Sequence, residues 1–287
     1  MEVFFQTLVL AVSNVSVYVL LGTSVSLLFG VVGILNFAQG DFMTVAAYVG
    51  YFGVATIGFG WLASFSLILP AMVLVGLAFY LLVLRPTRKH DPALVLVATF
   101  GLARLSQGIV QLIWGGVPLG IPRINGAWNV GGVAVPYSVA ISVVLAAIGL
   151  GGLLVVLGRT PFGREIRATA QDRTGAALVG INANRIELGA VVLSVVLTGL
   201  AGLMIMQREL LTPFVGFDIV LKAFAVAIVA GLGRVNGLLP AALILGFAEG
   251  LVAGYVSAAV AEAAIFGAVM LTLLVRPQGI AGARLRT

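Results

Sequence analysis

The chain has 287 residues, of which 61% are hydrophobic and 9% are charged, and its mean hydropathy is +1.18. Soluble globular domains carry about 25% charged residues, so this composition excludes a sizeable soluble domain and predicts an integral membrane protein. The net charge of +6 comes from basic residues without interleaved aromatic side chains, which argues against nucleic-acid binding, and the absence of cysteine excludes disulfides and thiolate metal sites.

The hydropathy pattern predicts eight or nine membrane-spanning helices. A helix needs about 20 apolar residues to cross the ~30 Å hydrocarbon core. We therefore expect an all-α polytopic membrane protein, built as a single transmembrane domain over residues 1–287. The predicted spans lie near residues 8–30, 42–58, 61–84, 93–113, 137–157, 186–206, 219–233, 237–256 and 259–275.

Between the first two spans, the segment 33-GILNFAQGDF-42 carries three polar side chains, Asn36, Gln39 and Asp41, but no lysine or arginine. Irregular backbone at membrane depth survives only where protein buries it or where it lines a cavity. The segment therefore predicts a broken helix near residues 33–42, with its polar side chains satisfying freed backbone groups or contacting a polar solute. The alternative is that Asn36 and Asp41 cap the two helix ends.

The loop 85-RPTRKHDP-92 holds the single histidine, His90. Because the chain has no cysteine and no cluster of carboxylates in its sequence, we expect no metal site. No serine in the sequence is arranged with His90 as a nucleophile with its base, so an enzyme is not expected. We interpret His90 as a solvated loop residue.

The fourth predicted span, residues 93–113, has a polar stripe. Arg104, Gln107 and Gln111 share one helical face at spacings of three and seven residues. A charged residue at the centre of a membrane helix costs about 2.5 to 3.5 kcal/mol on insertion scales, so it needs a role. The stripe either lines a polar pathway or lets Arg104 pair with an internal carboxylate. Pairing is favoured because charges buried in membranes are usually matched.

The next break, residues 114–136, contains three prolines, six glycines and two tryptophans. This composition predicts an ordered extracytoplasmic hairpin or cap. Its tryptophans are expected to anchor the segment at the membrane interface.

The break at residues 158–187 is longer and contains a predicted helix between Gly163 and Gly180. Its spacing predicts an amphipathic helix. This helix either lies on the surface, in water or among lipid headgroups, or inserts into a cytoplasmic partner. The residues of its predicted apolar side are Ile166, Ala170, Ala177 and Ile181.

Three charged residues of the last spans also need an account. Lys222 follows Asp218 at a spacing of four, which predicts a local ion pair. Glu249 lies in the middle of its span, either protonated or hydrogen-bonded in a packing seam, or in a pathway or subunit contact. Glu262 is expected to reach water at the outer interface. Small residues that allow close helix packing run beside Glu249 at Ala242, Gly246, Gly250 and Gly254.

The distribution of lysine and arginine predicts the orientation. Twelve of the 16 basic residues lie in alternate breaks and in the tail, and positive residues stay cytoplasmic. We therefore expect a cytoplasmic C-terminus and an extracytoplasmic N-terminus. The twelve are Arg85, Arg88, Lys89, Arg159, Arg164, Arg167, Arg173, Arg185, Arg234, Arg276, Arg284 and Arg286, while Arg123 and Arg208 fall in the breaks predicted to face out.

Three separated motifs occur in one order along the chain: 33-GILNFAQGDFM-43, 163-GREIRATAQDRTGAALVGIN-182 and 222-KAFAVAIVAGLGRVNG-237. Together they resemble the LivH-type permeases of the branched-chain amino acid class of ABC importers. The resemblance implies a bacterial inner-membrane subunit that works with a LivM-type second permease, two cytoplasmic ABC ATPases and an extracytoplasmic solute-binding protein. Relatives often place histidine where this chain has Gln39, which leaves a substrate-specific role of that position in doubt.

In this family the loop corresponding to residues 163–182 is the coupling helix that transmits the movement driven by ATP. The chain has no GxxxxGK[ST] phosphate-binding loop, so ATP and Mg²⁺ are expected on the partner subunits and no cofactor on this chain. The residues that the resemblance assigns to ATPase coupling are Gly163, Glu165, Arg167, Ala168, Gln171, Gly180 and Ile181.

The leading hypothesis is a transmembrane permease subunit of an importer for branched-chain or other amino acids, or related small amides, that works by alternating access. A secondary transporter is the alternative, with Asp41, Arg104 and Glu249 as its coupling charges. A passive channel is a third possibility. The predicted pathway residues are Asn36, Gln39, Asp41, Arg104, Gln107 and Glu249, and the predicted packing residues are Gly246, Gly250 and Gly254.

Overall fold

The structure is a computed structural model, and it describes residues 2–87, 91–121, 124, 126–130, 132–276 and 278–281. Of the residues discussed above, His90 lies outside the described residues. So do the basic residues Arg88, Lys89, Arg123, Arg284 and Arg286.

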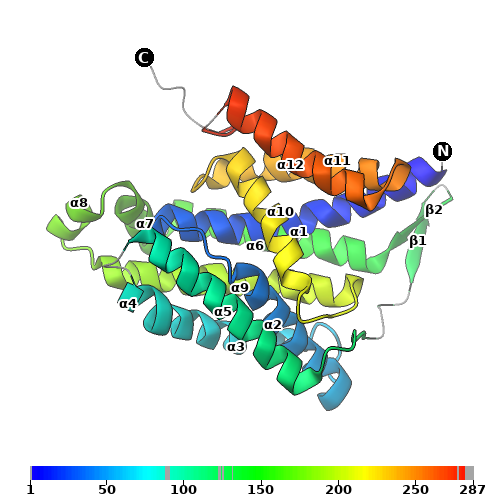
Figure 1. Cartoon of the computed structure of the whole chain (residues 1–287), viewed down its shortest axis with the longest axis horizontal. Coiled ribbons are helices and arrows are strands. Elements are labelled where there is room, and N and C mark those ends of the chain that lie inside the picture. The colour runs from blue at the N-terminus through cyan, green and yellow to red at the C-terminus, as the bar shows by residue number, and fades with distance from the viewer. Residues whose placement is uncertain are drawn as a thin grey trace.

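The described chain is mostly helical (Figure 1). In chain order its elements are α1 (Glu2–Val32), α2 (Gln39–Phe52) with the π-helical turn η1 (Gly53–Ile57), α3 (Phe65–Phe79) with the π-helical turn η2 (Tyr80–Leu84), α4 (Arg85–Thr87), α5 (Pro92–Trp114), β1 (Ala127–Val130), β2 (Val133–Pro136), α6 (Tyr137–Arg159), α7 (Pro161–Gln171), α8 (Arg173–Leu178), α9 (Ala183–Arg208), α10 (Val215–Ala230), η3 (Val235–Gly237), α11 (Leu238–Tyr255) and α12 (Ala258–Val275).

Seven helical segments within the described residues are long and apolar enough to cross a membrane. The sequence pattern predicts eight or nine, and the difference lies in two short helices. Helix α2 has 14 residues and begins with polar side chains, and α10 has 16 residues. The seven are Phe4–Val32, Phe65–Thr87, Ala93–Trp114, Tyr137–Arg159, Ala183–Arg208, Val235–Tyr255 and Ala258–Val275.

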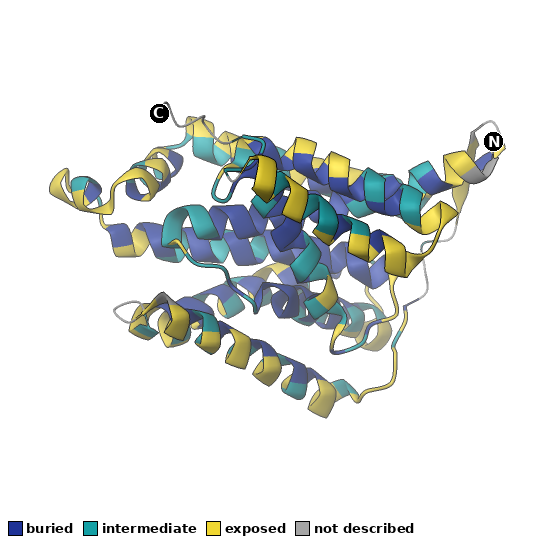
Figure 2. Cartoon of the chain, turned by 45° about the horizontal axis from the view of Figure 1, so that its top comes forward, coloured by how far each residue is buried: buried dark blue, intermediate teal, exposed yellow. Residues whose placement is uncertain are grey.

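Helix α1 forms the centre of the molecule and packs against α6, α9, α10 and α11. Helices α1 and α9 are mostly buried within the chain, whereas only a minority of the residues of α5, α6 and α12 is buried. Figure 2 shows this as a buried central layer with exposed helices outside it. The exposed helices are therefore the surfaces available to lipid or to another subunit.

The small-residue row of α11 lies against α1. A Cβ atom added at Gly246 would lie 2.6 Å from Val15 Cγ2, and one at Gly250 would lie 2.5 Å from the Cβ of Ala11. At Gly254 the nearest atom is Thr7 Cγ2, also at 2.6 Å. Close packing of this kind replaces the hydrophobic effect as the attraction between helices in lipid.

The two short helices, α2 and α10, begin beside each other. A Cβ atom at Gly40 would lie 2.1 Å from the carbonyl oxygen of Gly216, and a Cβ atom at Gly216 would meet the carbonyl oxygen of Gly40 at the same distance. Only glycine fits both positions. The contact holds the first turns of α2 and α10 together.

The breaks predicted to face opposite sides of the membrane lie at opposite ends of the molecule (Figure 1). Helices α4, α7 and α8 gather at the left end. The turn after α10 meets the C-terminal segment through an Arg234 Nη1 hydrogen bond to the carbonyl of Ala281 at 2.5 Å. Strands β1 and β2 lie at the right end (Figure 1). Leu119 pairs with Leu211 in an isolated bridge that joins the segments before β1 and before α10.

The expectation of an all-α chain needs one correction. Strands β1 and β2 form an antiparallel hairpin in the segment 114–136, with Ala127 opposite Pro136 and Val130 opposite Val133. The hairpin itself agrees with the ordered hairpin or cap predicted there. The prolines and glycines of this segment interrupt helical structure, and the valine-containing strands on either side of a short turn can then pair.

Candidate functional site

Helix α2 begins inside the protein, well before the end of its predecessor. Gln39, its first residue, contacts Ser24 of α1, which lies eight residues before Val32. At a rise of ~1.5 Å per residue, this is about 12 Å from the C-terminal end of α1. Gln39 also contacts the middle of α9. The chain from Gly33 to Ala38 therefore runs back into the helical bundle before α2 starts.

Gln39 is the centre of a buried polar cluster. Its Nε2 lies 2.6 Å from Thr198 Oγ1 and 3.1 Å from Ser194 Oγ, and it also contacts Ser24 Oγ. Asn36 Nδ2 donates to Gln39 Oε1 at 2.9 Å. All five side chains are buried. The cluster satisfies the amide of Gln39 and ties the start of α2 to α1 and α9.

The backbone of the interruption is satisfied in part by side chains. Asn36 Oδ1 accepts from the Ala38 amide at 3.0 Å, and Thr99 Oγ1 of α5 accepts from the Phe37 amide at 3.4 Å. The N-cap residue of α2 is Ala38, whose side chain makes no capping bond. Asn36 therefore closes the turn before α2, while the carboxylate of Asp41 makes its side-chain hydrogen bond to another helix.

Asp41, Gln107 and Arg104 form a chain of hydrogen bonds from α2 to α5. Gln107 Nε2 donates to Asp41 Oδ1 at 2.7 Å, and Arg104 Nη1 donates to Gln107 Oε1 at 2.9 Å. Asp41 and Gln107 are buried, whereas Arg104 is exposed. A carboxylate only accepts hydrogen bonds, so it orients the amide of Gln107 with its oxygen toward Arg104.

Two aromatic rings flank the guanidinium of Arg104. Its Cζ lies 5.0 Å from the ring centroid of Phe100 and 5.2 Å from that of Phe217, within the range of cation–π contacts. The ring of Phe37 packs edge-on against Phe100 at 6.3 Å. The interruption, α5 and the first turn of α10 therefore all contribute to the surroundings of Arg104.

The structure thus brings five of the six predicted pathway residues into one region, in two adjoining groups. Asn36 and Gln39 lie in the buried hydroxyl cluster, and Asp41, Gln107 and Arg104 lead outward to the surface of α5. Gln111 is exposed on the same face of α5. The sixth residue, Glu249, belongs to a separate network.

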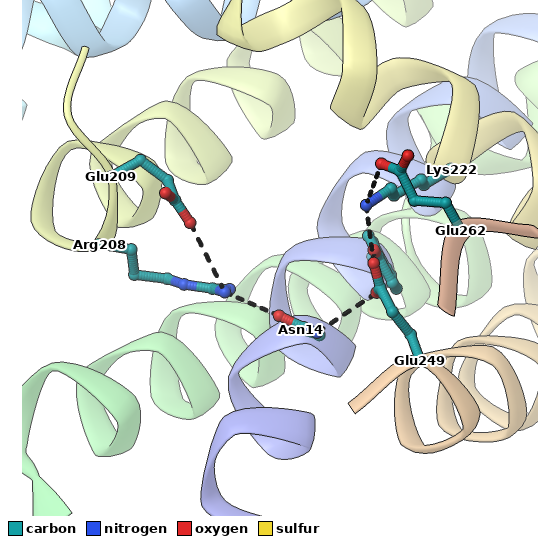
Figure 3. A network of polar contacts seen from close by, with 7 residues as sticks. Asn14, Arg208, Glu209, Lys222, Glu249 and Glu262 are labelled. Carbon is teal, nitrogen blue, oxygen red and sulfur yellow. Dashed lines mark hydrogen bonds and ion pairs between the residues drawn. The ribbon is translucent and has the colours of Figure 1, made fainter. Parts of the chain in front are cut away.

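Glu249 of α11 is the centre of an ionic network between helices (Figure 3). Lys222 Nζ of α10 lies 2.7 Å from Glu249 Oε1 and 3.2 Å from Glu262 Oε1 of α12. Asn14 Nδ2 donates to Glu249 Oε2 at 3.3 Å, and the Tyr18 hydroxyl donates to the same oxygen. The network joins α1, α10, α11 and α12.

The same network extends to the end of α9. Arg208 Nη2 donates to Asn14 Oδ1 at 2.7 Å and lies 4.0 Å from Glu209 Oε1 (Figure 3). Arg208 is only 21% exposed, although the sequence pattern places it in a break that faces out. A basic residue near a helix end can fold back onto the neighbouring helices, and sequence alone does not distinguish this from exposure to water.

Two predicted ion pairs differ from the structure. The sequence predicts that Lys222 pairs with Asp218 on its own helix, but it pairs with Glu249 and Glu262 instead, because these carboxylates of α11 and α12 face it across the helix interface. Arg104 was expected to pair directly with an internal carboxylate. It reaches Asp41 only through Gln107, because it points outward from α5 between the two rings.

The predicted helix between Gly163 and Gly180 is two helices, α7 and α8. Asp172 ends the first with φ −152° and ψ 108°, and its Oδ1 accepts from the Thr174 amide at 2.9 Å, which caps the second. This break rotates the later residues out of register. Ala177, after the break, is exposed and Ile181 is half-buried. Before the break, the buried side of α7 follows Gly163, Ile166 and Thr169, so Ala170 is exposed, and neither alanine belongs to the predicted apolar side.

Helix α7 is fixed against the end of α6. Thr160 caps it by accepting from the Gly163 amide at 3.0 Å, and a Cβ atom at Gly163 would lie 2.0 Å from the carbonyl oxygen of Val156. Its buried side consists of Gly163, Ile166 and Thr169. Arg167 and Gln171 are exposed, and Glu165 and Ala168 are half-buried.

Helix α8 projects from the bundle beside α7 and presents an apolar tip. Leu178 is 85% exposed and Val179 is 76% exposed, just before Gly180 turns the chain with φ +86°. Arg173 anchors the base of α8, with Nη1 2.6 Å from Glu187 Oε1 of α9. Helices α7 and α8 therefore form a rigidly mounted surface that is basic on α7 and apolar at the tip of α8.

Several residues of these networks carry no signal in the sequence. Ser24, Ser194 and Thr198 are single hydroxyls in apolar spans, where a hydroxyl commonly bonds to its own helix backbone. Asn14 and Tyr18 could have been linked by their spacing of four on one face of the first span, opposite an acid in another span. Only the packing of α1 against α11 shows that the acid is Glu249.

Comparisons with known proteins agree over nearly the whole chain. Residues 7–274 match the family model described as branched-chain amino acid transport system / permease component. The chain is 30% identical to the high-affinity branched-chain amino acid transport system permease protein LivH of Escherichia coli, over 97% of this chain and 96% of that protein. It is 28% identical to the corresponding protein BraD of Pseudomonas aeruginosa, with the same coverage. Among solved structures, PsaBC from Streptococcus pneumoniae in complex with Fab shares the fold, with a TM-score of 0.53, 10% identity and coverage of 97% of this chain and 93% of that chain.

The ionic network gives a prediction for stability. Glu249→Ala leaves Lys222 with only the 54% exposed Glu262 and removes the acceptor of Asn14 and Tyr18. It is expected to lower the free energy of unfolding in detergent micelles by about 3 kcal/mol, because a buried ion pair is broken and buried donors lose their acceptor. Glu209→Ala is the matched control, because its carboxylate is half exposed and surface pairs contribute about 0–1 kcal/mol. The double variant Lys222→Met, Glu249→Met should recover part of the loss. Equal stability of Glu249→Ala and Glu209→Ala would show that the network contributes little.

Proposed function

This chain belongs to the family of branched-chain amino acid transport system permease components, and we propose that it forms the membrane pathway of an ATP-driven importer together with a second permease of the LivM type. It is a multi-pass membrane protein, and its described residues include seven apolar helical segments that are long enough to span. As a permease component it is a transport subunit rather than an enzyme. Two ABC ATPases on the cytoplasmic side and a solute-binding protein on the outer side complete the proposed complex, with ATP and Mg²⁺ bound on the ATPases.

The observation that carries the proposed pathway is the exposed arginine on α5. Arg104 lies on one of the most exposed helices and is connected through Gln107 to the buried carboxylate of Asp41. A charged side chain facing lipid at this depth would be costly, so this face of α5 is expected to meet the second permease or a water-filled route. Alternating access would then open this route first to the outside and afterwards to the cytoplasm.

The proposed solutes are amino acids with apolar side chains. The relatives in Escherichia coli and Pseudomonas aeruginosa are named for the transport of branched-chain amino acids. The rings of Phe100 and Phe217 at Arg104, with Phe37 packed against Phe100, provide apolar surface next to a cation. This combination suits a small solute with a carboxylate and an aliphatic side chain.

The proposed orientation follows the basic residues. The end of the molecule that carries α4, α7, α8 and the turn at Arg234 holds most of the described lysine and arginine residues outside the spans, and positive residues stay in the cytoplasm. The β1–β2 hairpin and the segment around Leu211 would then face out. This places the C-terminus in the cytoplasm and the N-terminus outside.

Helices α7 and α8 are the proposed contact with an ATPase. They lie at the proposed cytoplasmic end, and their exposed residues combine the charge of Arg164 and Arg167 with the apolar tip of Leu178 and Val179. The Thr160 cap joins α7 to the end of α6, and the Arg173–Glu187 ion pair joins α8 to α9. A displacement of α7 and α8 would therefore be transmitted to these two membrane helices.

Reconstitution tests the function as a whole. Proteoliposomes that contain this chain, the second permease and both ATPases should accumulate L-leucine when ATP and the binding protein are supplied. Liposomes with this chain alone should not accumulate L-leucine under a proton or sodium gradient. Accumulation by the chain alone would favour a secondary transporter, and equilibration without accumulation by the full complex would favour a channel.

The proposed coupling surface has a separate prediction. Replacement of Arg167 and Ala168 together by glutamate places bulky acidic side chains on α7, and the two ATPases should no longer co-purify with the permease because the complementary surface is lost. Arg85→Glu is the control, since it reverses a charge at the same end of the molecule but outside α7 and α8. Retention of both ATPases by the Arg167, Ala168 variant would place the contact elsewhere.

A further inference from the structure

Arg104 lies near the middle of its helix, unlike arginines near the ends of membrane-spanning helices, whose side chains can reach the interface. It is the thirteenth of the 23 residues of α5, so at ~1.5 Å per residue it lies about 15 to 18 Å from either end. A long basic side chain near a helix end can reach the interface, but from the middle of a span this is too far. The guanidinium is therefore held at membrane depth.

The guanidinium is oriented but not saturated. Within the part of the chain that the structure describes, Nη1 makes one hydrogen bond, to Gln107, and the rings of Phe100 and Phe217 contact the group at 5.0 and 5.2 Å. An arginine side chain has several further N–H donors in a fixed planar fork, a geometry that matches a carboxylate. The unused donors are available to an acceptor that arrives from outside this chain.

The support behind Arg104 fixes its direction. Asp41 is 1% exposed and accepts from Gln107 with Oδ1, while Oδ2 has no hydrogen-bond partner among the described residues. The carboxylate of Asp41 orients the Gln107 amide so that its oxygen accepts the hydrogen bond from Arg104. This hydrogen bond fixes the orientation of the guanidinium. Phe217 stands in the first turn of α10, which the Gly40–Gly216 contact holds against α2. Residues of three helices, α2, α5 and α10, therefore fix the position of the Arg104 side chain.

Building on the proposed function, we propose that Arg104 binds the carboxylate of the amino acid as it crosses the membrane. The free edge of the guanidinium takes the carboxylate in a bidentate pair, and the rings of Phe100 and Phe217 take the aliphatic side chain. Asp41 and Gln107 act as positioning residues behind it. The ligand class is a small monocarboxylate with an apolar substituent, and an amide or amine of the same shape is not bound.

Weak binding inside the assembled complex can be measured directly. The complex of this chain with its second permease and the two ATPases, in lipid nanodiscs without the binding protein, is mixed in turn with L-leucine, isovalerate and L-leucinamide. Saturation-transfer-difference NMR reports which of these small molecules touch the protein. L-leucine and isovalerate should give signals from the native complex, and L-leucinamide should give at most one tenth of the L-leucine signal.

The variants locate the binding. Arg104→Gln should reduce the L-leucine and isovalerate signals at least tenfold, and Arg104→Lys, which keeps the charge but loses the fork, should retain part of them. Arg85→Gln is the control, because it removes an exposed arginine near the end of another span and should leave the signals unchanged. Equal L-leucine signals in the native and Arg104→Gln complexes, or equal signals from L-leucine and L-leucinamide in the native complex, would overturn the proposal.

A carboxylate of the second permease is the competing acceptor. If Arg104→Gln and Arg104→Lys both fail to assemble with the second permease, the arginine makes an ion pair between subunits and the proposal is overturned. If Arg104→Gln assembles, its uptake of L-leucine in proteoliposomes should fall at least tenfold while ATP hydrolysis stimulated by the loaded binding protein persists. If the native complex and the Arg104→Gln variant take up L-leucine equally well, the role of Arg104 is refuted but the proposed function stands. If the native complex takes up no L-leucine, the proposed function is refuted.

Discussion

The interruption between Val32 and Gln39 is the constraint from which the site follows. Its backbone lies within the helical bundle, where unpaired amide groups are costly, and the side chains of Asn36, within the interruption, and of Thr99 on α5 satisfy part of it. The amide of Gln39 then requires the hydroxyls of Ser24, Ser194 and Thr198 on α1 and α9. Helix α2 can therefore start only at this depth, and its first turn carries Asp41 to the place where Gln107 of α5 reaches it.

The contact between Gly40 and Gly216 extends the same constraint to α10. Because both positions admit only glycine, the first turns of the two short helices lie against each other and Phe217 reaches Arg104. Further along α10, Lys222 joins Glu249 and Glu262, so the helix is tied by charge to α11 and α12. A displacement of α10 would thus change the contacts of Arg104 and those of the ionic network together. Helix α10 therefore connects the two polar regions.

The sequence predicts the membrane class, most span positions and the broken helix, because hydropathy and the lack of basic residues in 33–42 reflect solvent directly. It does not predict which side chains meet. Lys222 has an acid four residues before it, yet tertiary packing brings a less exposed one closer, and Arg104 meets Asp41 only through an amide. The break at Asp172 was missed because the apolar spacing was read as one continuous helix, although aspartate favours caps and turns over helix interiors. Single hydroxyls such as Ser24 have no distinctive pattern in a span.

The central claim is that the face of α5 bearing Arg104 borders a water-filled route. This chain has no cysteine, so the labelling of one introduced cysteine can be followed in this subunit without background from other residues of the chain. In the assembled complex, Arg104→Cys and Leu105→Cys lie at nearly the same depth but about 100° apart around the helix. The account predicts that a charged, membrane-impermeant thiol reagent modifies the cysteine at position 104 at least tenfold faster than that at 105. Equal rates at the two positions would contradict it.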